Sequence, residues 1–275
     1  MLPNPLFELL GKGVYAYGIF IAIGLLACLL VFFYFTNKKG MAQKVQDFTF
    51  IVVVVAIAIG FLFAKLYQTF YNWIEDGVWD FYSAGITVMG GLIGGAGTFL
   101  LIYFLVGKYI FKGKEKGLHV KQFNMTFSVA PICICVAHAF GRIGCLMSGC
   151  CHGKFLGKEY VFGGIKMKGT TNGWGYYVPT QLYEALFLFA LGAVLTYLYF
   201  NRSNILMHIY LIAYGVWRMI IEIFRTDARG GFVLGLAPSQ WQSVIFIAGG
   251  IALLLIYKYK KIPFFLPKQE NKSNK

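Results

Sequence analysis

The fold is decided by the apolar run VYAYGIFIAIGLLACLLVFFYF, residues Val14–Phe35, which contains no charged side chain. A helix that crosses the hydrocarbon core of a bilayer needs about 20 mainly apolar residues. The run meets that length, and it lacks the basic n-region and the small-residue cleavage site of a signal peptide. It therefore predicts a membrane-spanning helix that is not cleaved.

The rest of the chain repeats this character. Six further stretches are long and apolar enough to span: Phe48–Phe70, Gly85–Val106, Phe123–Met147, Thr180–Phe200, Ile205–Phe224 and Gln240–Tyr257. The composition agrees, because 58% of residues are hydrophobic and only 13% are charged, against about 25% charged in soluble domains. This excludes a soluble enzyme, a disordered chain and a nucleic-acid-binding module. We expect an all-α integral membrane protein with seven transmembrane helices.

Basic residues predict the orientation of these helices. The chain has 25 Lys and Arg against 11 Asp and Glu, a net charge of +14. Basic side chains follow the first, third, fifth and seventh stretches, at Lys38, Lys39, Lys44, Lys108, Lys112, Lys114, Lys116, Lys121, Arg202, Lys258, Lys260 and Lys261. The positive-inside rule makes that side cytoplasmic. The N-terminus is then outside and the C-terminus cytoplasmic.

The same scheme predicts the remaining organisation. An extracytoplasmic loop, about residues 148–179, follows the fourth helix and contains four lysines, which long loops tolerate. We expect one transmembrane domain over residues 1–262. Residues 263–275 are polar and charged, and they predict a disordered cytoplasmic tail.

A polar stripe interrupts the sixth stretch. Its members are spaced by four, four and three residues, which places them on one helix face: Tyr214, Arg218, Glu222 and Arg225. Charges at the bilayer centre cost about 2.5–3.5 kcal/mol on insertion scales and are therefore candidates for function. One interpretation is an ion-pair ladder in which Glu222 neutralises both arginines. The surplus positive charge favours the other, an anion site, because a planar guanidinium suits a phosphate.

A second polar cluster ends the fourth stretch: His138, Gly141, Arg142, Gly144, Cys145, Ser148, Gly149, Cys150, Cys151, His152 and Gly153. The glycines permit close approach of a ligand or of another helix, and Arg142 is a credible phosphate partner. The cysteines with His152 suggest a metal set, a disulfide or a reactive thiol. Zinc ligands usually come as a pair C-x₂₋₄-C with a second pair elsewhere, and the spacing here does not fit that rule. We therefore expect no metal, and among disulfides we favour Cys145 with Cys150 or Cys151.

Three smaller patches complete the polar inventory. Tyr15 and Tyr17 begin the first stretch, where an aromatic belt at the interface is expected. The run Met89-Gly90-Gly91-Leu92, followed by Gly94-Gly95, indicates close helix packing or a glycine-lined groove. Pro179 to Glu184 opens the fifth stretch, and the helix dipole favours a carboxylate such as Glu184 near a helix N-terminus.

Taken in order, these motifs resemble those of the prolipoprotein diacylglyceryl transferase family. Residues 141–149 with Gly153 are similar to the family signature GRxGNFxNxExxG. The other landmarks are Tyr17-Gly18 for the first-helix tyrosine motif, Ala64-Lys65-Leu66 for ARLG, Met89–Leu92 for HGGL, Pro179–Glu184 for PSQLYE, and Tyr214–Arg225 for YxxxRFxxExxR. The resemblance covers nearly the whole chain, and seven helices with the N-terminus outside is the topology of the family.

The resemblance implies an enzyme of the bacterial cytoplasmic membrane whose site faces the outer leaflet. It would move diacylglyceryl from phosphatidylglycerol to the lipobox cysteine of a preprolipoprotein, without cofactor or nucleic acid. Arg142 and Arg218 would hold the lipid phosphate. Tyr17, Tyr214 and Glu222 would orient the head group and the arginines. The implied substrate-binding set also contains Arg225, Gly141, Gly144, Gly90, Gly91, Gln181 and Glu184.

Departures from the family pattern leave the proton acceptor open. Met89 replaces the histidine of HGGL, and Cys145, Ser148 and Cys150 replace two asparagines and a glutamate of the signature. Since methionine cannot accept a proton, the base would be His138, His152, a tyrosine or a bound water. Two other functions stay open: a thiol-dependent transferase using Cys150 or Cys151, and a non-catalytic phospholipid-binding or transport protein.

Overall fold

The computed structural model describes residues 5–9, 12–169, 172–201, 205–225 and 237–260. Its helices are α1 (Ala16–Lys38), α2 (Gln43–Asp76), α3 (Val88–Leu101), the π-turn η1 (Ile102–Val106), α4 (Gly107–Ile110), the 3₁₀ turn η2 (Gly113–Glu115), α5 (Leu118–Ser148), α6 (Thr180–Phe200), α7 (Leu206–Glu222) and α8 (Pro238–Lys260). Its strands are β1 (Phe7–Leu9), β2 (Lys12–Val14), β3 (Phe155–Gly157), β4 (Ile165–Gly169) and β5 (Gly173–Tyr177). Arg202 and the predicted tail, residues 263–275, lie outside the described residues.

The helices confirm a mainly helical membrane protein. Six helical runs in the described part of the chain are long and apolar enough to cross a bilayer: α1, α2, residues 88–110, α5, α6 and α8. The sixth predicted span corresponds to α7, which has 17 residues. At 1.5 Å per residue its length is about 26 Å, slightly less than the hydrocarbon thickness of about 30 Å. The seventh crossing therefore stays a prediction.

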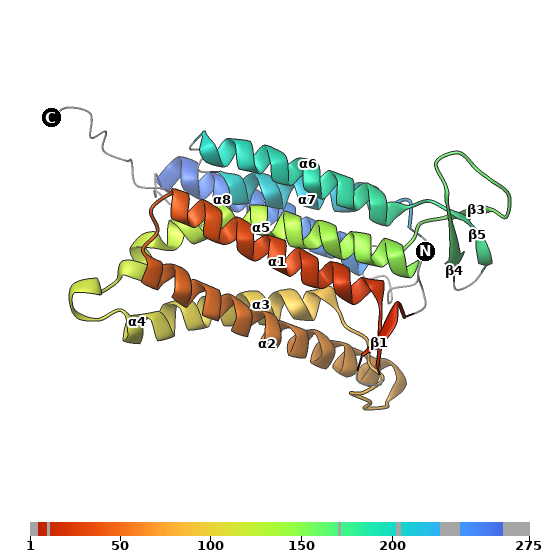
Figure 1. Ribbon diagram of the computed structural model, residues 1–275, viewed down its shortest axis with the longest axis horizontal. Helices are drawn as coiled ribbons and strands as arrows, with labels where there is room; N and C mark the ends of the chain where they lie inside the picture. The colour runs from red at the N-terminus through yellow and green to blue at the C-terminus, as the bar shows by residue number, and fades with distance from the viewer. Residues whose placement is uncertain (1–4, 10–11, 170–171, 202–204, 226–236, 261–275) are drawn as a thin grey trace. The chain divides into compact units, whose positions relative to one another are not determined.

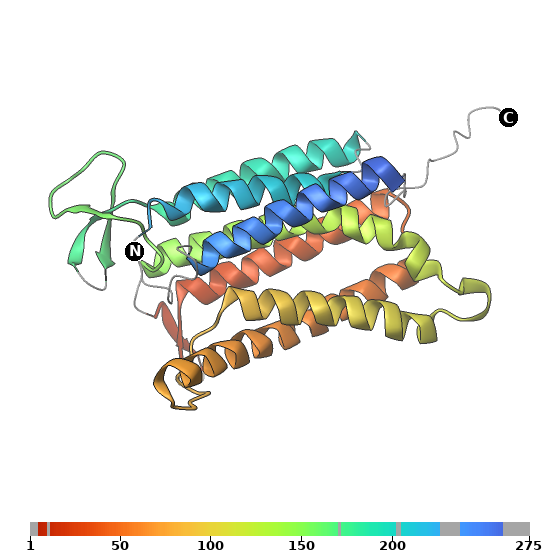
Figure 2. The same ribbon diagram turned by 180° about the vertical axis from the view of Figure 1, so that it is seen from behind.

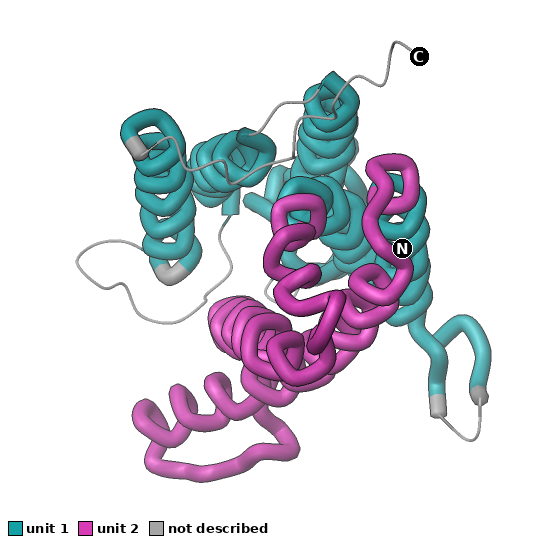
Figure 3. The backbone as a smooth tube through the Cα atoms, turned by 90° about the vertical axis from the view of Figure 1, so that its left-hand side faces the viewer, with its two compact units in different colours: residues 1–35, 127–275 teal, residues 36–126 magenta. Residues whose placement is uncertain are grey.

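The chain forms two compact units (Figure 3). The first unit consists of residues 1–35 and 127–275, and the second of residues 36–126. The first unit contains α1, most of α5, α6, α7 and α8, which run along a common direction (Figures 1 and 2). Small residues let these helices approach closely. A side chain at Gly24 of α1 would meet the carbonyl of Ala137 at 3.0 Å, and one at Gly215 of α7 would meet that of Ser243 at 3.0 Å. This is the packing expected of helices that lack a hydrophobic driving force between them.

β3, β4 and β5 lie beyond the last turn of α5 and the first turn of α6, whereas β1 lies by the start of α1 (Figures 1 and 2). β1 and β2 form an antiparallel pair before α1, and the second sheet has the order β3-β5-β4. These short strands lie in the segments before α1 and after α5, and the spanning segments are helical as predicted. β5 contains Trp174, Tyr176 and Tyr177, and aromatic residues favour strands.

The second unit is built around the packing of α2 on α3. A side chain at Gly60 of α2 would lie 3.2 Å from the carbonyl oxygen of Gly91, and one at Gly90 would lie 2.7 Å from that of Phe63. The glycines of α3 thus let the two backbones touch, which confirms the helix-packing interpretation. Gly90 also lines an apolar cavity of about 250 Å³ with Tyr67 and Ile93, so the groove interpretation holds for this residue as well.

Candidate active site

Glu184 is the buried centre of a polar cluster in the first unit. It lies one turn into α6 and its side chain is completely buried. Arg142 of α5 meets it at two points, with Nη2 3.0 Å from Oε1 and Nε 3.0 Å from Oε2. The sequence predicted Glu184 near a helix N-terminus, where the helix dipole favours a carboxylate. The structure confirms this position. It also shows that the carboxylate pairs with Arg142, which belongs to another helix.

Three more side chains converge on the same carboxylate. The Tyr214 hydroxyl donates to Oε1 at 3.0 Å, Arg218 Nη1 lies 3.9 Å from Oε2, and His138 Nε2 lies 3.7 Å from Oε1. Arg218 also pairs with Glu222, with Nη2 2.9 Å from Oε2. We call these residues the Glu184 cluster: His138, Arg142, Glu184, Tyr214, Arg218 and Glu222. It joins α5, α6 and α7.

The ion pairs of this cluster differ from the ion-pair ladder that the sequence suggested for the sixth predicted span. Glu222 pairs with Arg218 as expected, but Arg218 also faces Glu184 from α6. Within the cluster two guanidiniums face two carboxylates, and Arg225 is the third arginine of the two polar stretches. That residue lies beyond the end of α7, is buried, and forms an isolated β-bridge with Gly153. Arg142 and Arg218 do converge from separate helices, and each already holds a carboxylate.

The chain reverses where α5 ends. Gly149 has a φ of 74°, and the Cys150 N–H donates to the carbonyl of Cys145 at 3.1 Å. This turn folds Cys150 and Cys151 back over the last turn of α5, so the Sγ atoms of Cys145, Cys150 and Cys151 all lie within 4.8 Å of one another. We call these residues the thiol cluster. All three are free thiols, so the predicted bridge from Cys145 to Cys150 or Cys151 is wrong for this structure.

Neighbouring groups give the thiols outside the helix different proton affinities. Side-chain hydrogen bonds from Cys145 and Cys150, with the positive charges of Arg225 and Arg142, lower the pKa of Cys151. Hydrogen bonding to Cys145 and Cys151, together with burial, raises the pKa of Cys150. Cys151 is therefore the thiol whose thiolate these surroundings stabilise, and a thiolate is the form that reacts or binds metal.

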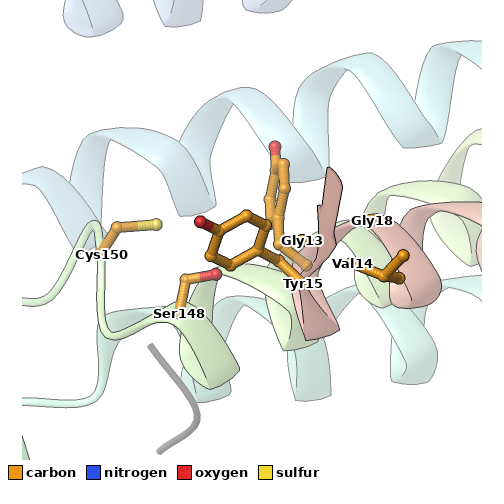
Figure 4. Close-up of a pocket in the computed structure, with 7 residues that line it drawn as sticks. Gly13, Val14, Tyr15, Gly18, Ser148 and Cys150 are labelled. Carbon is orange, nitrogen blue, oxygen red and sulfur yellow. The ribbon is translucent and has the colours of Figure 1, made fainter. Parts of the chain in front are cut away.

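An open groove adjoins the thiol cluster. It has a volume of about 590 Å³ and is lined by residues that precede or begin α1 and by residues at the end of α5: Gly13, Val14, Tyr15, Tyr17, Gly18, Ser148 and Cys150. Figure 4 shows Ser148 and Cys150 on one side, with the Cys150 sulfur directed toward Tyr15 and Gly13 on the other. A side chain at Gly144 would lie 3.2 Å from the carbonyl oxygen of Tyr17, which lines the groove. The helices α1 and α5 therefore approach each other closely here. Gly141 faces open space.

The remaining predicted site residues are placed as follows. Gln181 donates to the Cys150 carbonyl. His152 Nδ1 lies 3.0 Å from the Gly153 carbonyl oxygen, and the His152 ring packs on Tyr177 at 4.2 Å. Met89, Gly90 and Gly91 belong to the second unit. Sequence reasoning missed Thr180, whose hydroxyl donates to the Cys151 carbonyl at 2.9 Å; its place in the motif Pro179–Glu184 was the available signal.

Apolar spanning helices around a buried arginine–carboxylate cluster define a multi-pass membrane protein with an internal polar site. The family model described as prolipoprotein diacylglyceryl transferase matches residues 4–256. The chain therefore belongs to the prolipoprotein diacylglyceryl transferase family, a family of transferases.

Curated relatives cover the chain almost completely. A protein of Clostridium tetani is 30% identical over 273 residues, 93% of this chain and 98% of its own, and is named phosphatidylglycerol–prolipoprotein diacylglyceryl transferase. A protein of Clostridium perfringens with the same name and the suffix 2 is 29% identical, covering 92% of this chain and 94% of its own. One from Dehalococcoides mccartyi, again with that name, is 30% identical over 89% of each chain.

Proposed function

We propose that this chain transfers the diacylglyceryl group of phosphatidylglycerol to the lipobox cysteine of preprolipoproteins. The observation that carries the proposal is the convergence of Arg142 and Arg218 on Glu184 in a chain that matches the transferase family over residues 4–256. Guanidiniums paired with carboxylates keep a fixed orientation, and each offers five N–H donors in a planar fork. The pair with Glu184 uses Nε and Nη2 of Arg142, which leaves Nη1 for a phosphate oxygen.

The reaction makes one bond and breaks another. The acceptor thiol gives up its proton to a base, and its sulfur bonds to the glyceryl carbon while the bond between that carbon and the phosphate oxygen breaks. The electron pair leaves on the phosphate, and glycerol phosphate departs. Arg142 and Arg218 stabilise the charge that develops there, while Tyr214 and Glu222 hold their carboxylate and guanidinium partners. We assign Tyr17, which lines the groove, to orienting the lipid head group.

We place the site at the outer leaflet of the bacterial cytoplasmic membrane, with the N-terminus outside. Lys38, Lys39 and Lys44 at the junction of α1 and α2, with the lysines over residues 108–121, support this orientation through the positive-inside rule. Protease sites inserted at Glu159 and at Lys114 test it in spheroplasts. External protease is expected to cut at the first position and to spare the second. The reverse pattern would refute the orientation.

Purified protein with phosphatidylglycerol and a lipobox peptide tests the activity. We expect a thioether product and glycerol phosphate, both lost in Arg142→Ala and Arg218→Ala, whereas Tyr15→Phe has a mild effect. Complementation of a strain depleted of its own lipoprotein transferase tests the same activity in cells. A folded protein that binds the lipid and yields neither product would instead be a lipid-binding protein.

A further inference from the structure

The thiol cluster has the dimensions of a metal site. Cys145, Cys150 and Cys151 hold their sulfur atoms within 4.8 Å of one another. Zinc–sulfur bonds of about 2.3 Å place two sulfurs on one ion at most about 4.6 Å apart, and about 3.8 Å apart in a tetrahedral site. Small side-chain rotations therefore bring the three sulfurs to coordination distance. The sequence argument against a metal assumed two spaced pairs, whereas the turn after α5 supplies three ligands from one segment.

The backbone that carries these thiols is fixed. Cys151 has a φ of 61°, a left-handed conformation that costs a residue other than glycine about 1–2 kcal/mol. Two neighbours from α6 hold it there, because Thr180 donates to the Cys151 carbonyl at 2.9 Å and Gln181 to the Cys150 carbonyl. Strain of this kind persists where the surroundings impose it, and it concentrates at functional sites.

The surrounding charge suits a metal–thiolate group. Three thiolates on a divalent cation carry a net negative charge, and Arg225 forms a backbone bridge with Gly153, two residues after Cys151. Arg225 is buried, so its attraction is weakly screened. A buried cation next to the thiol cluster favours an anionic centre there.

A metal ion held by these three thiols would keep a fourth coordination position. Catalytic zinc sites keep three protein ligands and leave one position for water or substrate. Within the described residues, the group of possible metal ligands at this place consists of these three thiols. His152 makes other contacts, because its Nδ1 lies near the Gly153 carbonyl oxygen and its ring packs on Tyr177. Cys150 is exposed and lines the groove beside Tyr17. A substrate thiol that enters the groove therefore reaches the cluster.

We propose that Cys145, Cys150 and Cys151 bind Zn²⁺ as a three-thiolate site whose fourth position takes the acceptor cysteine of the lipoprotein substrate. The inference rests on the proposed function and supplies the step that Met89 cannot perform. A thiol that coordinates zinc is deprotonated, and its proton passes to water. The zinc-bound sulfur then bonds to the glyceryl carbon while the electron pair of the breaking carbon–oxygen bond leaves on the phosphate. Zinc keeps its oxidation state, and the neutral thioether, a weaker ligand, dissociates.

Covalent catalysis by Cys150 is the competing use of the same thiols. Attack by its sulfur on the glyceryl carbon would form a thioether on the enzyme. An alkyl thioether has no good leaving group, so a second transfer from Cys150 to the substrate cysteine would be blocked. Coordination avoids this difficulty because the enzyme sulfurs are never alkylated.

Metal binding is tested on the full chain in detergent micelles with a phosphine reductant, after treatment with a chelator. Titration with Co²⁺ should give one ion per chain and a sulfur-to-cobalt charge-transfer band that Zn²⁺ abolishes. Cys145→Ser, Cys150→Ser and Cys151→Ser should each weaken binding at least tenfold. Cys135→Ser, a buried cysteine of α5 outside the cluster, should bind like the wild type. Equal binding by the wild type and the triple serine variant would overturn the proposal.

The role of the fourth position is tested with the substrate. A lipobox peptide should change the visible spectrum of the Co²⁺ protein, and the same peptide with serine for cysteine should leave it unchanged. Diacylglyceryl transfer should fall at least tenfold after chelation, return with Zn²⁺, and persist in Cys135→Ser. Full activity in the stripped protein or in the triple variant would refute the zinc step and leave the proposed function intact. Stoichiometric zinc with no thioether product at any loading would refute both the proposed function and the acceptor role.

Discussion

Arg142 of α5 and Glu184 of α6 form a two-point ion pair, with both nitrogen–oxygen distances at 3.0 Å and the carboxylate completely buried. The pair fixes the plane of the guanidinium, and Tyr214 donates to the same carboxylate from α7. A buried pair of this kind contributes little net stability, but removal of one partner is costly because the other charge remains buried. Glu184 thus positions the arginines that the proposed phosphate site needs.

Glu184→Gln is expected to destabilise the protein by about 3–5 kcal/mol, the usual result of breaking a buried ion pair. The change leaves Arg142 and Arg218 close together without their shared negative charge. Thermal unfolding in micelles measures the effect. Glu75→Gln, at an exposed carboxylate that accepts from Tyr71, is the matched control and should shift stability little. Equal shifts in the two variants would contradict the central role of Glu184.

Arg142→Lys and Arg218→Lys are each expected to lower the transfer rate by about 10²–10³-fold. Lysine keeps the charge but loses the planar fork that meets a carboxylate or phosphate at two points. Initial rates of thioether formation at saturating phosphatidylglycerol measure the loss. Lys154→Ala, in the loop after α5, serves as a charge control and should retain its rate. If either lysine variant is fully active, the phosphate role assigned to that arginine is wrong.

Gly144→Ala is expected to destabilise the first unit by about 1–3 kcal/mol through overpacking. Its new methyl group would lie 3.1 Å from Cδ2 and 3.2 Å from the carbonyl oxygen of Tyr17, which pushes α1 away from α5. Gly141→Ala is the internal control, because its methyl group meets no atom within 4 Å and alanine favours a helix by up to about 1 kcal/mol. Opposite signs for the two variants in thermal unfolding are the result to expect. Similar signs would show that α1 is not packed on Gly144.

Gly90→Ala is expected to destabilise the second unit. A methyl group there would lie 2.6 Å from Cβ of Tyr67 and 2.7 Å from the carbonyl oxygen of Phe63, so α2 and α3 must separate. Gly97→Ala, on the same helix with nothing within 4 Å, should be neutral or stabilising. Hydrogen exchange of the α2 and α3 amides distinguishes a local opening from global unfolding. Unchanged protection in Gly90→Ala would contradict the packing argument.

The sequence alone determined the membrane class and the helices. Hydrophobic length is a local property, because each span must satisfy its own backbone hydrogen bonds within the bilayer. The predicted span Thr180–Phe200 coincides with α6, and the other boundaries shift by a few residues, as with Ala16–Lys38 for α1. The order of the motifs likewise identified the family. Residues such as Arg142 and Tyr214 belong to motifs that are recognised by their spacing along the sequence.

Only the tertiary structure decided which polar groups meet. Glu184 and Arg142 are 42 residues apart, and no periodicity relates them. The three-stranded sheet after α5 and the approach of Thr180 to Cys151 are also long-range pairings. The three thiols meet because Gly149 and Cys151 take left-handed conformations at the end of α5, and spacing does not encode that turn. Local patterns therefore fix the spans, whereas contacts between distant segments, which depend on how the helices pack, create the site.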